Sequence, residues 1–443
     1  MTNSTYDHVR HLAVTTLEDN WRHDHTVPSR TLYPHQWSWD TGFIAVGLAH
    51  VAPERAWHDL RTLFEGQWAD GRLPHIVFDP TNGERDYFPG PRFWGSTGVP
   101  GAPARPTSGI VQPPVHALAA WELYQHAADD KARARGHEEL TWLYPRLVAQ
   151  QRYLITKRDI GGAGLASLVH PWESGQDNSP AWDKPLSAVP ADTSVLDRYR
   201  RRDLAVSERS HRPTDADYAR YITIAQDYRS YGYVDDGPGG RYRFLVECPA
   251  FNAVLAAAEH TLADIAEVVG ADPAPHRAQT ARLTATLAER LFDPDTGIFH
   301  ARDIYTDHLS PARTIGGLLP LILPELPRAQ VEALVAEATS SRFGLGDPAG
   351  LPLPSYDRTA ADLDPVRYWR GPIWLNMNWL LWRGLRTHGY DDLAATLRQS
   401  MIGLVDSSGC FEYFHTFTGE GVGAAEFSWT AALVLDLLAA GAD

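Results

Sequence analysis

Apolar residues recur at three- and four-residue intervals through most of this chain, and this helical periodicity constrains its fold more than any other feature. Short connections such as Val51-Ala52-Pro53 and Gly389 force neighbouring helices to run antiparallel. We therefore expect an all-α fold, in which six helical hairpins close into an (α/α)6 toroid. The predicted helices span residues 6–20, 40–51, 54–67, 113–127, 137–158, 250–270, 273–291, 312–323, 328–340, 371–388, 390–406 and 427–441.

Two long segments interrupt the helical pattern, at residues 68–112 and 159–249. Connections of that length inside a compact domain commonly carry function. We expect residues 1–443 to form a single domain, with both insertions forming a cap over one mouth of the toroid. Turn sequences at 79–83, 293–297 and 417–419 predict a few short β-hairpins.

Chemically unusual residues collect where every second predicted helix begins. Trp39-Asp40 opens the second helix, Gln112 precedes the fourth, Arg370 the tenth and Glu426 the twelfth. If these helices form the inner ring, their N-termini meet at one mouth, where free backbone N–H groups concentrate partial positive charge. The preference of Pro and Asp for helix starts explains some of these positions, but not the tryptophans beside them. This mouth is the predicted site.

The composition excludes several classes of partner. With 55 acidic and 40 basic residues the net charge is −15, which argues against a nucleic-acid partner, and no apolar run is long enough to span a membrane. Two cysteines, Cys248 and Cys410, form neither a disulfide framework nor a zinc site, and no export signal is visible, so we expect a cytoplasmic protein. We keep a homo-oligomer as an alternative to a monomer. The 15 Trp and 18 Tyr suggest a saccharide pocket, although a helical core explains part of them equally well.

The segment from His170 to Asp183 carries three carboxylates and two indoles without any helical or strand period. Gly175 lets the backbone approach a ligand, Trp172 offers a flat apolar face, and burial beside such rings raises the pKa of a carboxyl group. This combination of residues favours a carboxyl group that acts as a general acid. The alternative is a loop in which Asp and Ser cap a following turn.

The run Glu173-Ser-Gly-Gln-Asp177-Asn-Ser-Pro180 resembles the signature of glycoside hydrolase family 63, and its first part is shared with trehalases. The resemblance implies that Asp177 is the general acid. Both groups of enzymes invert configuration, which implies a second carboxylate as general base at roughly 6.5–9.5 Å. The resemblance selects Glu412, upstream of Phe-Ser-Trp, over Glu420 and Glu426; an exposed strand residue is the alternative for Glu412.

Two further segments resemble sugar-binding parts of that family. In Trp37-Ser38-Trp39-Asp40 the resemblance implies that Asp40 holds sugar hydroxyls, with a helix N-cap as the alternative. In the Arg370-Gly-Pro run, Trp374 and Trp379 cannot easily share one helix face, so we expect one of them in the core. The predicted substrate-binding residues are Tyr33, Trp37, Trp39, Asp40, Tyr87, Gln112, Trp172, Gly175, Arg212, Tyr218, Tyr368, Trp369, Arg370 and Trp374.

The small size of the chain makes it similar to the bacterial branch of family 63 that hydrolyses glucosylglycerate and mannosylglycerate. We therefore expect an inverting α-glycosidase for a small anionic glycoside, with glucosylglycerate first. Arg212 is suited to a glycerate carboxylate, with Tyr218 and Tyr87 nearby; a plain helix start, with ion pairs to Asp215 or Asp217, is the alternative. A trehalase-like α-glucosidase and a non-catalytic sugar-binding toroid stay open.

We expect no cofactor and no metal. His23-Asp24-His25 has no evident third ligand, and Gly161–Gly164 lacks a phosphate-loop lysine. The turn at Asp293–Gly297 lacks the distal glutamate of a calcium loop. His170 and His415, beside the predicted acids, either tune them or simply make hydrogen bonds.

Overall fold

Long helices dominate the structure, a computed structural model that describes residues 3–82, 87–198, 201, 203–206, 208–235 and 241–441. Each long helix outside the insertions matches a predicted one, although α6 begins at Asp130 rather than at 137 because the Asp129 side chain caps it. They are α1 (Asn3–Asp19), α2 (Ser38–Leu48), α3 (Pro53–Phe64), α5 (His116–Gln125), α6 (Asp130–Thr156), α10 (Pro249–Val269), α11 (Ala274–Arg290), α12 (Arg328–Thr339), α13 (Leu375–Thr387), α14 (Asp391–Ser408) and α15 (Ser428–Ala439).

The helix predicted at 312–323 is wrong. Two 3₁₀ turns, η6 (Ile315–Gly317) and η7 (Leu319–Ile322), take its place. The Gly316-Gly317 pair disfavours an α-helix, and Pro320 cannot donate a helical hydrogen bond. Gly317 is also pressed against its neighbours, since a Cβ there would lie 2.1 Å from the Phe299 carbonyl oxygen. The apolar spacing was therefore a poor guide in this segment.

The second insertion contains a helix that the periodicity missed, α9 (Asp215–Ser230). Thr214 and Asp217 form a capping box at its start, which confirms the helix start that we kept as an alternative. Its buried face includes Tyr221 and Tyr228 among smaller apolar residues, and these hydroxyl-bearing side chains made the helical spacing of apolar residues harder to recognise. Three short helices also lie in the insertions: α4 (Pro91–Trp94), α7 (Asp183–Ser187) and α8 (Asp203–Val206).

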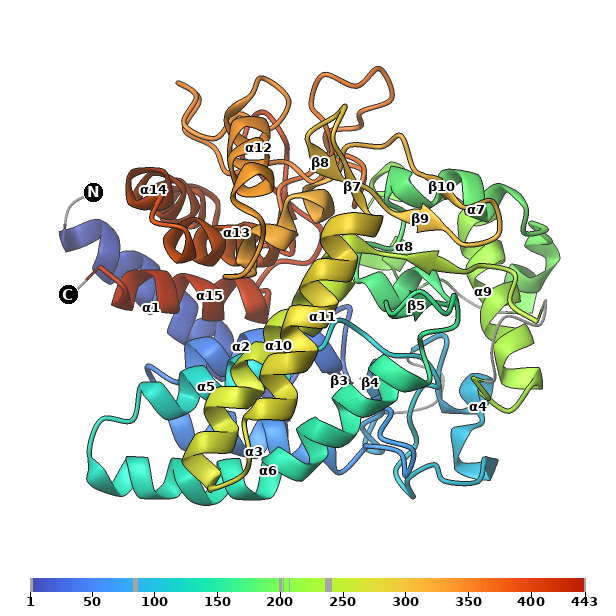
Figure 1. Ribbon diagram of the computed structural model, residues 1–443, viewed down its shortest axis with the longest axis horizontal. Coiled ribbons are helices and arrows are strands. Elements are labelled where there is room, and N and C mark those ends of the chain that lie inside the picture. The colour runs from blue at the N-terminus through green and yellow to red at the C-terminus, as the bar shows by residue number, and fades with distance from the viewer. Residues whose placement is uncertain are drawn as a thin grey trace.

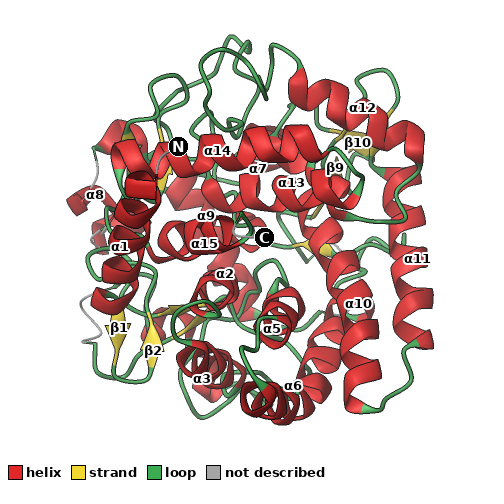
Figure 2. Ribbon diagram, turned by 90° about the vertical axis from the view of Figure 1, so that its left-hand side faces the viewer, coloured by secondary structure: helices red, strands yellow, loops and turns green. Residues whose placement is uncertain are grey.

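The long helices lie in two layers. Figure 2 shows α2, α5 and α15 enclosed by α1, α3, α6, α11 and α14. Within the inner layer, α2 contacts both α5 and α15, α10 contacts α5, and η7 lies between α10 and α13. Gly47 brings α2 against α15 closely, since a Cβ there would lie 2.2 Å from the Ala432 carbonyl oxygen. A side chain at this position would push the two helices apart.

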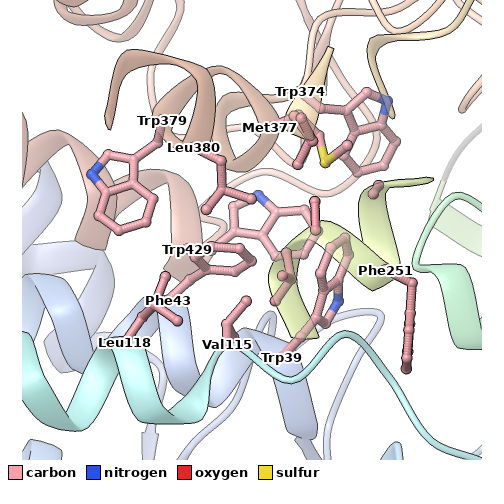
Figure 3. Packing of buried hydrophobic residues seen from close by; sticks show 14 of the residues in the cluster. Trp39, Phe43, Val115, Leu118, Phe251, Trp374, Met377, Trp379, Leu380 and Trp429 are labelled. Atoms are coloured by element: carbon pink, nitrogen blue, oxygen red, sulfur yellow. The ribbon is translucent and has the colours of Figure 1, made fainter. Parts of the chain in front are cut away.

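Aromatic and aliphatic side chains fill the space between the inner helices (Figure 3). Phe43 of α2 makes edge contacts with Trp379 of α13 and with Trp429 of α15, at ring-centroid distances of 6.0 and 6.3 Å. Val115 and Leu118, at the start of α5, pack into the same cluster. The inner helices therefore pack directly against one another behind their N-termini, and this packing sets the position of their first residues.

The strands are two residues long and antiparallel. The hairpins predicted around the turns at 293–297 and 417–419 are confirmed. The hairpin predicted around 79–83 is not seen, because the strand before that turn pairs with β3; Gly83 lies outside the described residues. One sheet has four strands in the order β10-β9-β6-β5. The strands are β1 (Trp21–Arg22), β2 (His25–Thr26), β3 (Gln36–Trp37), β4 (Ile76–Val77), β5 (Ser167–Leu168), β6 (Val246–Glu247), β7 (Phe292–Asp293), β8 (Ile298–Phe299), β9 (Arg302–Asp303), β10 (His308–Leu309), β11 (Tyr413–Phe414) and β12 (Gly421–Val422).

The two insertions lie together on the right-hand side of Figure 1, where α4 of the first is close to α9 of the second. Hydrogen bonds join them: the Tyr218 hydroxyl donates to the Phe88 carbonyl at 3.3 Å, and the Tyr233 hydroxyl donates to the Trp94 carbonyl. The insertions thus act as one layer, and side chains from both reach the pocket described below. Among the described residues, no helix has the length and apolarity needed to cross a bilayer.

Candidate active site

A pocket opens where the inner helices begin. It encloses about 940 Å³, the space at its open mouth included. Inner-helix starts supply one side of its lining and the insertions supply the other. The described lining residues are Leu32, Tyr33, Trp37, Trp39, Asp40, His75, Tyr87, Phe88, Pro89, Gln112, Trp172, Gly175, Asp177, Asp203, Arg212, Pro213, Tyr218, Tyr368, Trp374, Glu412, Phe427 and Trp429.

A buried ion pair holds the segment that carries Asp177. Arg158 and Glu173 are almost completely buried and form a two-pronged pair, with Arg158 Nη1 donating to Glu173 Oε2 at 3.0 Å. The Glu173 carboxylate also accepts hydrogen bonds from the backbone N–H groups of Val111 and Val169. The Glu173 carboxylate therefore connects the chain at Val111, Arg158 and Val169 to the segment that carries Asp177. Glu173 has this structural part and does not line the pocket.

Gly175 allows the same segment to pass directly over an indole. Its φ is +70°, in the left-handed region, and a Cβ there would lie 2.4 Å from the Trp39 ring. Beyond the glycine, the Asp177 carbonyl accepts a hydrogen bond from the Tyr221 hydroxyl at 3.0 Å, and Asn178 Oδ1 accepts one from Trp369 N at 2.9 Å. The backbone on both sides of Asp177 is therefore fixed, while its side chain faces the pocket.

The Asp177 carboxyl has the properties of a proton donor near neutral pH. Burial among aromatic rings raises the pKa of Asp177 to about 7; the nearby Arg212 guanidinium lowers this pKa, and the Glu412 carboxylate raises it. A carboxyl group with such a pKa is about half protonated at pH 7. It can therefore give a proton to a leaving oxygen and regain it from water between turnovers.

Glu412 lies in the same pocket and is surrounded by donors. Its Oε1 accepts from the Tyr33 hydroxyl at 2.7 Å, and its Oε2 accepts from Ala424 N at 3.1 Å. The Arg212 guanidinium spans both oxygens, with Nη2 at 2.7 Å from Oε2 and Nη1 at 3.3 Å from Oε1. Every partner donates, as an ionised carboxylate requires. This geometry suits a base rather than an acid.

The two competing glutamates lie elsewhere. Glu420 is exposed at the end of the β11–β12 hairpin. Glu426 is also exposed, with one oxygen 3.6 Å from Arg30 Nη2. Neither lines the pocket, and Glu412 is buried instead of being the exposed strand residue that we kept as its alternative. Arg212 pairs with Glu412, and not with Asp215 as the alternative for this arginine supposed. Asp215 accepts hydrogen bonds from Arg201 and Arg209.

Asp40 is the third buried carboxyl group of the pocket. It belongs to the first turn of α2, but Trp37 occupies the N-cap position, so Asp40 is not the cap. Burial raises the pKa of Asp40 well above its usual value, and repulsion from Glu412 and Asp177 adds to the effect. The Gln112 side chain accepts a hydrogen bond from Trp39 N at 3.2 Å, which satisfies one of the free N–H groups of α2. Asp40 and Gln112 thus present polar edges beside the indoles.

Among the predicted substrate-binding residues, all but Trp369 and Arg370 line the pocket. The Trp369 ring stacks under that of Trp374, with centroids 3.9 Å apart and planes 5° apart, so it supports the pocket wall from behind. Arg370 faces away and pairs with Asp183 at 2.8 Å and with Asp362 at 3.2 Å. Trp374 lines the pocket while Trp379 is in the core, which is the division we expected for this pair.

Several lining residues were missed by the sequence reasoning: Leu32, His75, Phe88, Pro89, Asp203, Pro213, Phe427 and Trp429. Phe427 and Trp429 flank the start of α15, where the clustering of aromatic residues at helix starts was a usable signal. His75 is different, because no motif surrounds it. It stacks on Trp172 at 6.3 Å and bonds Ser108 through Nδ1, and burial lowers its pKa well below the usual value. It therefore offers the pocket a neutral imidazole.

The two histidines beside the predicted acids make structural hydrogen bonds. His170 Nδ1 accepts from Trp172 N, and Nε2 donates to the Tyr221 carbonyl at 2.9 Å. Burial lowers the pKa of His170 to about 3, so it stays neutral. His415 Nδ1 accepts from the backbone of the 417–418 turn. Both histidines therefore make hydrogen bonds, which is the simpler of the two hypotheses that we gave for them.

Comparisons with known proteins show similarity over nearly the whole chain. Residues 33–430 match a family model described as the mannosylglycerate hydrolase MGH1-like glycoside hydrolase domain. The chain is 42% identical over 429 residues to the mannosylglycerate hydrolase of Thermus thermophilus, covering 96% of this chain and 99% of that protein. It is 36% identical over 424 residues to the glucosylglycerate hydrolase of Mycolicibacterium hassiacum, covering 93% and 94%. A solved family 63 mannosylglycerate hydrolase from Thermus thermophilus, in complex with Tris and D-glycerate, is 40% identical with a TM-score of 0.87, covering 97% of this chain and 99% of that one.

Proposed function

Because this chain belongs to the MGH1-like glycoside hydrolase family, we propose that it hydrolyses glucosylglycerate to glucose and glycerate, and mannosylglycerate in the same way. Some of its relatives are mannosylglycerate hydrolases and another is a glucosylglycerate hydrolase, and both names support this substrate class. The observation that carries the proposal is the position of Arg212. This guanidinium lines the pocket, it is 2% exposed, and its Nε atom has no hydrogen-bond partner among the described residues. A donor left over in a buried site needs an acceptor on the ligand, and an anionic acceptor is the strongest partner for a guanidinium.

In the proposed reaction, Asp177 protonates the glycosidic oxygen as the bond to glycerate breaks, and Glu412 removes a proton from the attacking water. The water attacks from the face opposite the leaving group, so the sugar is released with inverted configuration. The Arg212 and Tyr33 hydrogen bonds hold the Glu412 carboxylate in one orientation while it accepts the proton. The direct geometric requirement is a separation of about 6.5–9.5 Å between the two carboxyl groups.

The pocket divides into a sugar side and a leaving-group side under this proposal. The faces and hydroxyls of the sugar ring are read by Trp37, Trp39, Asp40, Gln112 and Trp374. Tyr87, Arg212 and Tyr218 surround the glycerate. In the fold that we propose to support this site, six inner and six outer elements close an (α/α)6 ring, with the 3₁₀ turns η6 and η7 in place of one helix. The insertions at 68–112 and 159–249 are then its cap.

The direct test uses synthetic glucosylglycerate, mannosylglycerate, trehalose and simple α-glucosides with the purified protein. We expect release of glycerate from the first two, with much slower cleavage of the neutral compounds. Proton NMR of the first minutes should show the β-anomer of the sugar before mutarotation. Initial release of the α-anomer would contradict the inverting mechanism, and equal rates on trehalose would contradict the substrate class.

The kcat/KM for glucosylglycerate should fall as pH rises through about 7. Burial raises the pKa of Asp177 to about 7, and a general acid works only in its protonated form. Its protonated fraction decreases about tenfold for each pH unit above that value, whereas below it Asp177 imposes no loss. The measurement is kcat/KM across the neutral range at constant ionic strength. A profile flat up to about pH 9 would remove Asp177 from the acid role.

Replacing Arg212 by alanine should separate anionic from neutral leaving groups. The change also removes a partner of Glu412, so it will slow every substrate. The informative quantity is the additional loss on glucosylglycerate relative to glucosylglycerol, which has the same shape without the carboxylate. A hydrogen bond to a charged group contributes about 1.5–3 kcal/mol, or roughly 10- to 150-fold in kcat/KM.

The matched control is Arg370→Ala, an arginine of the same region that faces away from the pocket. It should affect both substrates equally. Equal losses of the two substrates in Arg212→Ala would instead favour a trehalase-like enzyme with a neutral leaving group.

A further inference from the structure

Three inner helices that begin at the pocket end at a second cluster of functional side chains. His50 follows the end of α2, His126 is the C-cap of α5, and Asp436 lies near the end of α15. One potential ligand atom from each of the three lies within 4.8 Å of the others. His50 Nε2 is 3.0 Å from Asp436 Oδ1, and the two imidazole centroids are 4.5 Å apart. The proposed catalytic mechanism uses none of these residues.

We propose that His50, His126 and Asp436 form a binding site for a divalent transition metal, with Zn²⁺ as the preferred ion. Two imidazole nitrogens and one carboxylate oxygen are a common ligand set for Zn²⁺, and water completes the coordination. Ligand atoms bound tetrahedrally at about 2.0–2.2 Å from one ion lie about 3.3–3.6 Å apart. The potential ligand atoms of this cluster lie within 4.8 Å of one another, so side-chain rotations must bring them closer together around the ion.

The residues around the cluster already orient two of the ligands. His126 Nδ1 lies 2.9 Å from the Glu122 carbonyl, so this nitrogen is the protonated one and Nε2 keeps its lone pair for a metal. Asp436 Oδ2 accepts a hydrogen bond from Trp379 Nε1 at 2.8 Å, so Oδ1 is the oxygen that faces His50. Such outer hydrogen bonds fix the tautomer and direction of metal ligands. A bound ion would replace the hydrogen bond between Oδ1 and His50 Nε2.

The electrostatics and the accessibility also favour a cation. Carbonyl groups at the C-terminal ends of α2, α5 and α15 contribute partial negative charge, in addition to the Asp436 carboxylate. Arg383 is the nearby opposing charge, but it is paired with Glu122 at 2.5 Å. The side chains of His50 and Asp436 are 10% and 7% exposed, whereas that of His126 is 39% exposed. His126 thus marks the entry side of the site.

The test measures metal binding, independently of hydrolysis. Protein freed of metal with a chelator is titrated with ZnCl₂ by calorimetry, and its thermal unfolding is followed with and without Zn²⁺. We expect one ion per chain and an unfolding midpoint raised by a few degrees, since an ion that binds only the folded state stabilises it. His126→Ala should weaken Zn²⁺ binding at least about tenfold and remove the thermal shift.

Two further variants keep the test decisive. His308→Ala removes an exposed histidine from β10, outside the cluster, and should bind Zn²⁺ as the unaltered protein does. Asp436→Asn, nearly isosteric, should lose binding like His126→Ala. Absence of saturable binding in the unaltered protein, or unchanged affinity in both cluster variants, would overturn the proposal and leave His50 and Asp436 as a simple hydrogen-bonded pair.

Discussion

Asp177→Asn is expected to lower kcat on glucosylglycerate by about 10²- to 10⁴-fold, the usual contribution of a positioned general acid. The change keeps the size of the side chain and removes its proton. Because the Asp177 backbone is held by Tyr221 and its neighbour by Trp369, the loop should keep its shape, and KM should change little. Steady-state kinetics and a thermal unfolding curve measure both effects.

The same variant allows a sharper assignment. A glycosyl fluoride has a leaving group that needs no protonation, so Asp177→Asn should hydrolyse α-glucosyl fluoride at close to the unaltered rate. The matched control is Asp183→Asn in the same segment, whose carboxylate is 55% exposed and pairs with Arg370 outside the pocket. Equal losses on fluoride and on glucosylglycerate would show that Asp177 is not the proton donor.

Glu412→Gln should lower kcat by a similar factor on both glucosylglycerate and α-glucosyl fluoride, since each reaction needs an activated water. In Glu412→Ala, added azide has room to replace the water and should yield a glycosyl azide of inverted configuration. The identity and anomeric form of that product are read by NMR. Glu420→Gln and Glu426→Gln are the controls, because both carboxylates are exposed and outside the pocket.

Loss of the Glu412 charge also affects stability. Arg212 is 2% exposed and Glu412 1% exposed, and removing one partner of a buried ion pair costs about 3–5 kcal/mol. Urea unfolding should show this decrease for Glu412→Gln and not for Glu420→Gln. A variant that keeps full stability and full activity would contradict the position that we give to Glu412.

Much of the helical framework could be predicted from the sequence because it depends on local periodicity. The starts of α2 and α15 were also visible, since Trp39-Asp40 and Phe427-Ser428-Trp429 combine a helix boundary with residues that helices rarely place there, whereas α6 begins seven residues before its predicted start. The segment at 312–323 misled the prediction because its apolar residues face the core in 3₁₀ turns. Spacing alone does not distinguish the two kinds of helix when Gly and Pro intervene.

The contacts that define the pocket were less predictable. Arg212 and Glu412 are 200 positions apart, and the sequence offered Asp215 and Asp217 as nearer partners for the arginine. His75 contributes through a stack on Trp172 that no short motif records. Such pairings follow from the path of the insertions across the helix ends, and this path is set by tertiary packing rather than by local pattern.

The origin of the pocket walls has a consequence for engineering. The indoles that we propose to face the sugar are anchored at the starts of tightly packed helices, whereas Tyr87, Arg212 and Tyr218 belong to the two insertions. Directed evolution confined to Tyr87, Arg212, Tyr218 and their neighbours, with Gln112 and Asp177 kept, should therefore shift the enzyme towards new aglycones while it continues to recognise the same hexose. Libraries targeted to the helix starts should more often yield unstable proteins than altered specificity.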